Sequence, residues 1–137
     1  MSKSAGAERQ WSGAALAQPP GETLVKYMLL IYLDEAAMLS ASPDQMQQTM
    51  AAYRAYTDAL KAAGVHVGGE QLHPSTSATI VRNPDGKTKV LDGPYAEAKE
   101  QLAGYYIVEA PDLDAAVAWA ARCPGAANGS MEVRPIY

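Results

Sequence analysis

Hydrophobic and polar residues follow one another in short blocks whose spacing predicts six strands. Residues 27–32 form a continuous apolar run, typical of a strand buried on both faces or nearly so, and Asp34 and Glu35 end it. The other strands are predicted at residues 65–72, 77–82, 87–91, 104–109 and 131–136. Between the third and fourth strands lies Asn83-Pro84-Asp85-Gly86. Proline fixes one dihedral angle there and glycine supplies a left-handed position, so these two strands form a hairpin.

Two helices are predicted from apolar residues spaced three and four apart. Ser42 and Gln45 have the spacing of a capping box, and Pro43 suits the first helical position. This helix ends before Gly64, and its apolar face consists of Met46, Met50, Tyr53, Thr57 and Leu60. The second helix, residues 113–122, follows the capping Asp112 and is ended by Pro124; its stripe is Leu113, Ala116, Val117 and Ala120. One or two helical turns are also expected at residues 95–101.

The order of these elements predicts an α+β fold. It is the split β-α-β plan of ferredoxin-like domains, with an inserted β-hairpin between the second strand of the plan and the third. Such a sheet has helices on one face only, so its other face must meet water or something apolar. Two copies packed sheet on sheet would satisfy this requirement, and we therefore expect a homodimer.

Residues 1–24 differ in composition from the rest, being rich in Gly, Ala, Ser and Gln and ending in a Pro-Pro-Gly segment. We expect a flexible extension or a segment upstream of a natural start at Val25, followed by one domain at residues 25–137. Docking of Trp11 and Leu16 on a neighbouring surface is the remaining alternative. The apolar stretch at residues 13–17 is too short for a secretory signal, which needs about 7 or more apolar residues.

Composition narrows the function classes. The 137 residues carry a net charge of -4 with no basic run, which excludes wrapping around nucleic acid. The longest apolar run is far shorter than the roughly 20 residues of a membrane-spanning helix, so no membrane partner is expected. Cys123 is the only cysteine, which excludes an internal disulfide and a cysteine-based zinc site and fits a cytoplasmic protein. His66 and His73 show no metal-ligand pattern, and no cofactor is implied.

Several segments resemble one bacterial family. Residues 92–106, which begin Asp92-Gly93-Pro94-Tyr95, resemble the signature of the DGPF group of YCII-related proteins, with Tyr95 at a position that is usually Phe. Further matching segments are residues 26–32, 68–74, 118–124 and 133–136. The resemblance covers residues 25–137. It implies a ferredoxin-like fold assembled as a dimeric α+β barrel, a pocket beside the sheet, a cytoplasmic location and a function that is mostly unassigned.

The same resemblance bears on enzyme activity. Some members of the wider family are proposed to use a His/Asp pair on the first helix, with the Asp nine residues after the His. The corresponding positions of this chain hold Tyr53 and Ala62, so that pair is absent here. Members also often lie beside genes for extracytoplasmic-function sigma factors, which suggests a regulatory setting.

His73 and Asp92 are the candidate catalytic residues. His73 follows a strand and precedes Pro74, and it is either a surface loop histidine or a base in the pocket. Asp92 either accepts main-chain N–H groups of the next turn or acts as a pocket carboxylate that orients His73. Because both residues fall at strand ends, a His–Asp pair across neighbouring strands is compatible with the pattern.

Tyr53, Glu70, Tyr95 and Lys99 are the candidate ligand contacts. Tyr53 is either a core residue or a phenol that hydrogen-bonds a ligand. Glu70 follows Gly68-Gly69, and these glycines allow the backbone to approach a ligand or a partner subunit closely. Lys99 belongs either to a solvated turn or to an anion contact at the pocket mouth.

The chain has eight tyrosines and no phenylalanine, so nearly every core ring carries a hydroxyl. Burying a hydroxyl without a partner costs about 1–3 kcal/mol, so Tyr95 should reach Asp92 or Glu97 or point into the pocket. We expect Tyr53 and Tyr95 to mark the pocket. The other tyrosines should divide between the core and the dimer face; they are Tyr27, Tyr32, Tyr105 and Tyr106.

Three functions are compatible with the sequence. The first is a dimeric protein that binds a small molecule in a pocket near Asp92. The second is a cofactor-free enzyme that uses His73 and Asp92 for acid–base or elimination chemistry. The third is an interaction module linked to sigma-factor regulation.

Overall fold

We describe residues 23–94 and 97–137 of a computed structural model of the chain. The main sheet is antiparallel, with strand order β2-β5-β1-β6. Its strands are β1 Val25–Leu33, β2 His66–Gln71, β5 Gln101–Ala110 and β6 Ser130–Pro135. A separate two-stranded ribbon pairs β3 Thr79–Arg82 with β4 Lys89–Asp92. The predicted α+β architecture with an inserted hairpin is confirmed.

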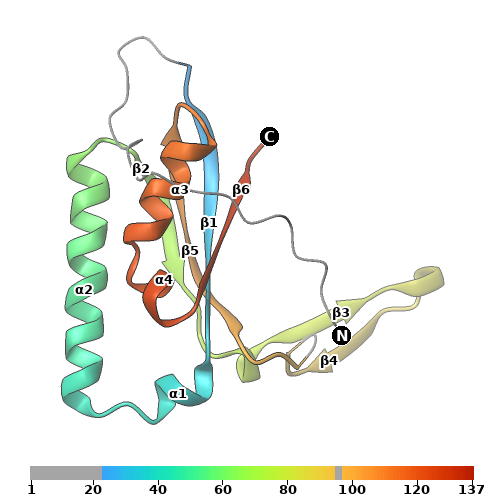
Figure 1. Cartoon of the computed structure of the whole chain (residues 1–137). Coiled ribbons are helices and arrows are strands. Elements are labelled where there is room, and N and C mark those ends of the chain that lie inside the picture. The colour runs from blue at the N-terminus through green and yellow to red at the C-terminus, as the bar shows by residue number, and fades with distance from the viewer. Residues whose placement is uncertain (1–22, 95–96) are drawn as a thin grey trace.

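Helices cover one face of the main sheet (Figure 1). They are α2 Pro43–Ala62, α3 Leu113–Arg122 and α4 Pro124–Asn128, while α1 Glu35–Leu39 lies at the end of the sheet. Short 3-10 turns lie at Ser75–Ser77 and Pro84–Gly86. The capping box of Ser42 and Gln45 is present at the start of α2, as predicted.

Four local predictions differ from the structure. The short helix α1 was not anticipated; it begins because the Asp34 carboxylate accepts the main-chain N–H groups of the first turn. Pro124 begins α4 instead of only ending α3, since proline fits the first position of a helix. Residues 97–100 are not helical, and Gln101 already pairs with Leu33 in the sheet. The strand predicted from residue 77 starts at Thr79, after a 3-10 turn.

β1 is buried on one face only, which corrects the prediction of a strand covered on both sides. Tyr27, Leu29, Ile31 and Leu33 are buried and face the helices. Met28, Leu30 and Tyr32 alternate with them and are half-buried on the opposite face, because successive side chains of a strand point to opposite sides.

The core lies between the sheet and the helices, and tyrosine hydroxyl groups form hydrogen bonds there. Tyr56 and Tyr106 meet edge to face with ring centroids 5.2 Å apart, and Tyr56 meets Trp119 at 6.5 Å. The Tyr106 hydroxyl lies 2.7 Å from the Thr57 hydroxyl. Within the described part of the chain, every buried side-chain nitrogen or oxygen has a hydrogen-bond partner.

The predicted apolar face of α2 is only partly covered. Leu60 is fully buried, but Met46 and Met50 are 45% and 55% exposed. The first half of α2 runs toward α1 at the end of the sheet (Figure 1), and these two methionines stay largely outside the core. In α3, Leu113 of the predicted stripe is likewise exposed, and Trp119 fills the core instead.

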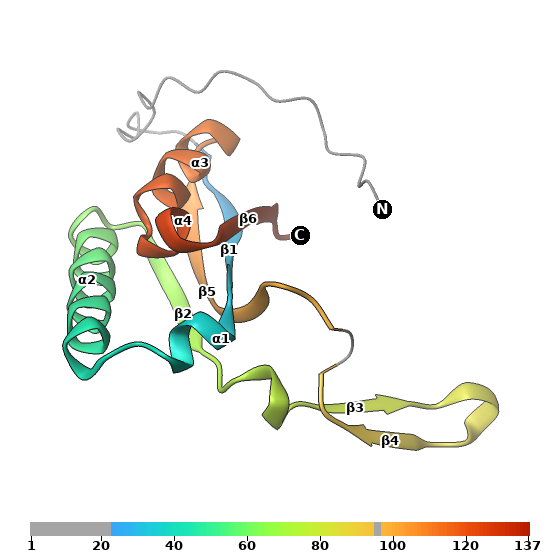
Figure 2. The same ribbon diagram turned by 60° about the horizontal axis from the view of Figure 1, so that its bottom comes forward.

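The ribbon of β3 and β4 projects from the end of the main sheet, on the side away from α2 (Figure 2). We call residues 79–92 the arm. Its pairing register joins Thr79 to Asp92 and Arg82 to Lys89, with the predicted turn between them. Asp85 and Gly86 adopt the left-handed φ angles of 53° and 76° that this turn requires.

Candidate functional site

The chain crosses between main sheet and arm at two points, which together we call the arm root. The outgoing crossing, residues 72–78, begins where the Leu72 N–H donates to the Ala103 oxygen at 2.8 Å. The returning crossing begins at Gly93, whose N–H donates to the Ala78 oxygen at 2.7 Å. The first bond extends the pairing of β2 with β5, and the second extends the pairing of β3 with β4.

His73 and Asp92 lie at the two crossings. His73 is exposed, two residues after the last residue of β2. Asp92 is the last residue of β4 and is also exposed; its carboxylate lies 3.5 Å from the Thr79 hydroxyl across the base of the arm. Among residues 23–94 and 97–137, no hydrogen bond joins His73 to Asp92. His73 and Asp92 thus lie on different crossings of the arm root, and no described residue bonds to the His73 imidazole.

Glu35 fixes the outgoing crossing and was not singled out by the sequence. Its two carboxylate oxygens accept the Ser75 N–H at 2.6 Å and the Ser75 hydroxyl at 2.7 Å. Its own main-chain N–H donates to the Gln101 side-chain oxygen at 3.0 Å. Because both oxygens already accept hydrogen bonds, Glu35 acts as an anchor that ties α1, the turn at Ser75 and the start of β5 together.

The remaining predicted contacts do not gather at one place. Glu70 is exposed on β2 opposite Tyr105, on the sheet face without helices. Tyr53 lies on α2, on the helix side, where it packs against the core. Lys99 is exposed in the segment before β5. Tyr95 lies outside the described residues, so the predicted contact of its hydroxyl with Asp92 or Glu97 stays a prediction.

Burial sets the chemistry of Tyr53. Removal from water raises the pKa of its phenol well above the usual value near 10, with Cys123 and Tyr106 adding smaller effects. Tyr53 is therefore a hydrogen-bond donor and not a base at neutral pH.

The sheet face opposite the helices, which we call the open face, has an apolar centre. Met28, Leu30, Tyr105 and Ile107 lie on neighbouring strands and are half-buried. The four tyrosines of β1 and β5 divide between the two faces of the sheet: Tyr27 and Tyr106 lie toward the helices, and Tyr32 and Tyr105 lie on the open face. That the open face is a dimer face stays a prediction.

Polar side chains flank this centre along β6. The Tyr32 hydroxyl donates to one Glu132 oxygen at 3.0 Å, and Arg134 donates to the other from Nε at 3.1 Å. The hydrogen bond from Arg134 lowers the pKa of the Glu132 carboxyl, so this group is ionised at neutral pH. The sequence pattern indicated the alternation along β6 but gave no sign of this cross-strand network.

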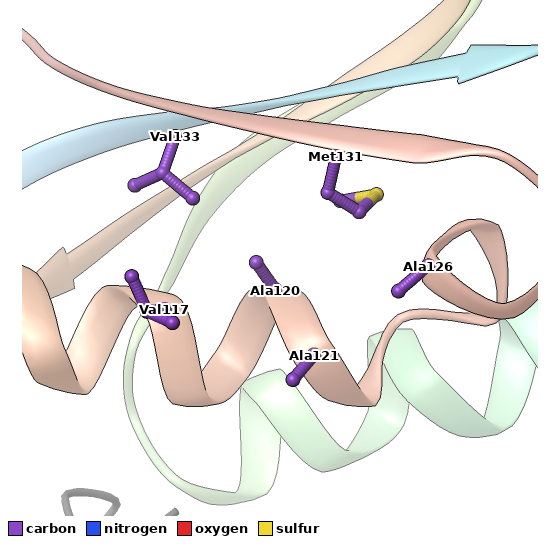
Figure 3. A pocket seen from close by; sticks show the side chains of 6 residues that line it. All are labelled: Val117, Ala120, Ala121, Ala126, Met131 and Val133. Carbon is purple, nitrogen blue, oxygen red and sulfur yellow. The ribbon is translucent and has the colours of Figure 1, made fainter. Parts of the chain in front are cut away.

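A shallow apolar groove lies on the helix side, between α3, α4 and β6 (Figure 3). Its volume is about 300 Å³, and it is lined by Val117, Ala120, Ala121, Ala126, Met131 and Val133. No polar side chain points into it, so it offers no group that could orient a substrate or exchange a proton. It is also separate from the predicted site, because the helix layer and the arm lie on opposite sides of the sheet (Figures 1 and 2).

Metal and thiol chemistry have no support in the described part of the chain. No group of three or more His, Cys, Asp or Glu side chains there is arranged to hold a metal ion. Cys123 is buried, and burial raises the pKa of its thiol to about 11. No helix within residues 23–94 and 97–137 is long and apolar enough to cross a membrane.

Comparison with known proteins gives two matches. The family model of the YCII-related domain matches residues 25–137. A protein of Rhizobium meliloti (strain 1021), described as uncharacterised, is 37% identical over 116 residues, which is 80% of this chain and 90% of that protein. The family match extends over the sheet, the helices and the arm.

Proposed function

Because the chain belongs to the YCII-related domain family, we propose that it acts as a homodimer that binds a small molecule at the arm root. One observation carries this proposal. The open face and the arm meet at a corner, and His73 and Asp92 lie at the two crossings of that corner. In a single copy the corner is open to solvent. A second copy stacked on the open face would enclose it.

The open face supports the homodimer. Its centre is apolar while charged side chains stand around it, with Lys26 opposite Glu109 on two strands and Glu132 beside Arg134 on β6. An apolar centre with a polar rim is the usual anatomy of a protein interface. A two-fold arrangement would pair this surface with itself.

Sedimentation velocity tests the homodimer. The wild-type chain should sediment as a dimer of the 14.5 kDa polypeptide, and Leu30→Glu should shift it to monomer by placing a charge in the apolar centre. Ala55→Glu on the exposed side of α2 is the matched control and should remain dimeric. A monomeric wild-type chain at micromolar concentration would refute the assembly.

The arm root supports binding of a polar molecule. The His73 imidazole can donate and accept hydrogen bonds, and Asp92 contributes a carboxylate acceptor. We therefore expect a ligand that carries both donors and acceptors, such as a hydroxy acid or an amide.

Thermal shift with a panel of small hydroxy acids and amides tests this site. At least one compound should raise the melting temperature of the wild-type protein. The shift should be lost in His73→Ala and Asp92→Asn and kept in Asp58→Asn, an exposed carboxyl on α2. A ligand whose binding survives both arm-root substitutions lies elsewhere, and the proposed site is then wrong.

A cofactor-free acid–base enzyme is the alternative, favoured by the exposed imidazole of His73 and the exposed carboxylate of Asp92 on the two crossings of the arm root. In that case a compound found by thermal shift should be converted over hours, as followed by NMR of the mixture. His73→Gln should stop conversion while leaving binding in place, because glutamine keeps hydrogen bonds but does not exchange protons near pH 7. If the wild-type protein does not convert the compound, the enzyme alternative is wrong and ligand binding stands as the proposed function.

A further inference from the structure

The arm carries large apolar side chains that the described residues of the same copy leave exposed. Val81, Val90 and Leu91 are 61%, 63% and 65% exposed. The pairing register puts Val81 and Val90 on one face of the ribbon and Leu91 with the half-buried Ile80 on the other, so both faces carry exposed apolar side chains. An isolated two-stranded ribbon is marginally stable in water. A second surface that covers these side chains would therefore stabilise the arm.

We propose that the arm of each copy lies across the α1–α2 end of the second copy, against a surface formed by Leu39, Met46 and Met50. This inference rests on the proposed homodimer. It adds a second contact, beyond the sheet faces, and it names the segment of each copy that makes it.

The length and direction of the arm fit this contact. The arm leaves the end of the sheet where α1 and the start of α2 lie, and it points to the open-face side (Figures 1 and 2). The four residues of β3 span about 10 Å at roughly 3.3 Å per residue, and the turn at residues 83–88 extends the arm further. Stacked sheets lie about 10 Å apart, so the tip would pass beneath the sheet of the second copy and reach its helices. A two-fold axis along the strands brings the same end of both copies together.

The receiving surface is the least covered apolar part of the helix layer. Leu39 on α1 is 74% exposed, and Met46 and Met50 are 45% and 55% exposed at the end of α2 next to α1. The two methionines belong to the helix face that the sequence pattern predicts to be buried. Methionine side chains adapt to irregular apolar partners, which suits contact with valine and leucine of the arm.

Charge is complementary across the proposed contact. Between residues 27 and 53 the chain has no Lys or Arg but carries Asp34, Glu35 and Asp44, so the receiving end is acidic. The outer half of the arm carries Arg82, Lys87 and Lys89 against one acidic residue, Asp85. Opposite charges at the rim of an interface favour association and fix orientation.

Cross-linking between different chains tests the contact directly. Val90→Cys in one chain and Met50→Cys in another, both in a Cys123→Ala background, are mixed and treated with a short bismaleimide. A cross-linked dimer is expected on denaturing gels. Val90→Cys mixed with Lys61→Cys is the matched control, because Lys61 is exposed at the opposite end of α2, and it should stay monomeric on the gel.

Charge reversal tests the same contact without new thiols. Lys87→Glu with Lys89→Glu should raise the dimer dissociation constant about tenfold at low salt, with a smaller effect at high salt. Asp44→Lys in the same chain should restore affinity. Lys61→Glu, away from the contact, should leave the constant unchanged.

The outcomes separate the two proposals. A wild-type dimer with the expected cross-link and charge rescue supports the arm contact. A wild-type dimer that gives no Val90–Met50 cross-link and no rescue overturns the arm contact while the sheet-to-sheet homodimer stands. A monomer in sedimentation overturns both.

Discussion

The Tyr56 hydroxyl on α2 donates a 2.7 Å hydrogen bond to the main-chain oxygen of Trp119 on α3. The acceptor belongs to the last turn of α3, where helix oxygens lack partners within the helix. A phenylalanine here could fill the core but could not donate this hydrogen bond. The tyrosine does both, because its ring packs in the core and its hydroxyl donates to an oxygen at the end of a neighbouring helix.

Tyr56→Phe should lower the free energy of unfolding by about 1–2 kcal/mol, because a buried oxygen loses its donor while the packing of the ring is kept. Urea unfolding followed by tryptophan fluorescence measures the change. Tyr137→Phe, in a fully exposed side chain, is the control and should have no effect. Equal stabilities of wild type and Tyr56→Phe would show that this bond contributes nothing net.

Gly69→Ala and Gly68→Ala form a matched pair within β2. A methyl group on Gly69 would lie 2.6 Å from the Tyr105 main-chain oxygen, whereas one on Gly68 would meet nothing within 4 Å. We expect Gly69→Ala to cost about 1–3 kcal/mol of stability and Gly68→Ala to change it by less than about 0.5 kcal/mol. Thermal unfolding of both variants at one protein concentration decides the point. If the two variants lose similar amounts of stability, the close contact at Gly69 is not the cause of the destabilisation.

The Cys123 thiol should be unreactive in the folded protein. It is 2% exposed, and its raised pKa of about 11 leaves almost no thiolate at neutral pH. A thiol reagent such as Ellman's reagent should label it in urea but only at the rate of unfolding in buffer. Rapid labelling of native protein would contradict the burial of this side chain.

Stability should fall at alkaline pH. The thiol of Cys123 has a pKa near 9.0 when unfolded and about 11 when folded, so the folded state keeps its proton to higher pH. The contribution of this thiol to the free energy of unfolding is therefore fully present below pH 9 and is lost as the pH rises from 9 to 11. The free energy of unfolding falls over this range by at most about 1.4 kcal/mol per pH unit. Urea unfolding at several pH values measures the slope. In Cys123→Ala the free energy of unfolding should fall less steeply between pH 9 and 11. An unchanged slope would mean that the tyrosines, and not Cys123, cause the loss of stability.

The sequence predicts a structural feature well when the residues that interact to form it are close together along the chain. The capping box of Ser42 and Gln45 and the turn at Asn83-Pro84-Asp85-Gly86 form as expected, because each depends on neighbouring residues. Pro124 is ambiguous, since proline both ends one helix and begins another.

Longer-range features are harder to predict from sequence. The pattern of α2 identifies Met46 and Met50 as an apolar face but does not say whether the same copy covers it. The sequence does not indicate the role of Glu35, because its partner Ser75 lies 40 positions away and no periodicity links the two residues. His73 and Asp92 lie at strand ends as predicted, but the two strands are not neighbours, because β2 belongs to the main sheet and β4 to the arm.

The bare face of the main sheet has a consequence for growth of assemblies. The outer strands offer little to a further strand, since β6 ends in Pro135, which has no N–H group, and the pairing of β2 is interrupted near Gly68. In the proposed homodimer each copy covers the open face of the other, so neither copy keeps an open face for a third. Association by this route is therefore self-terminating.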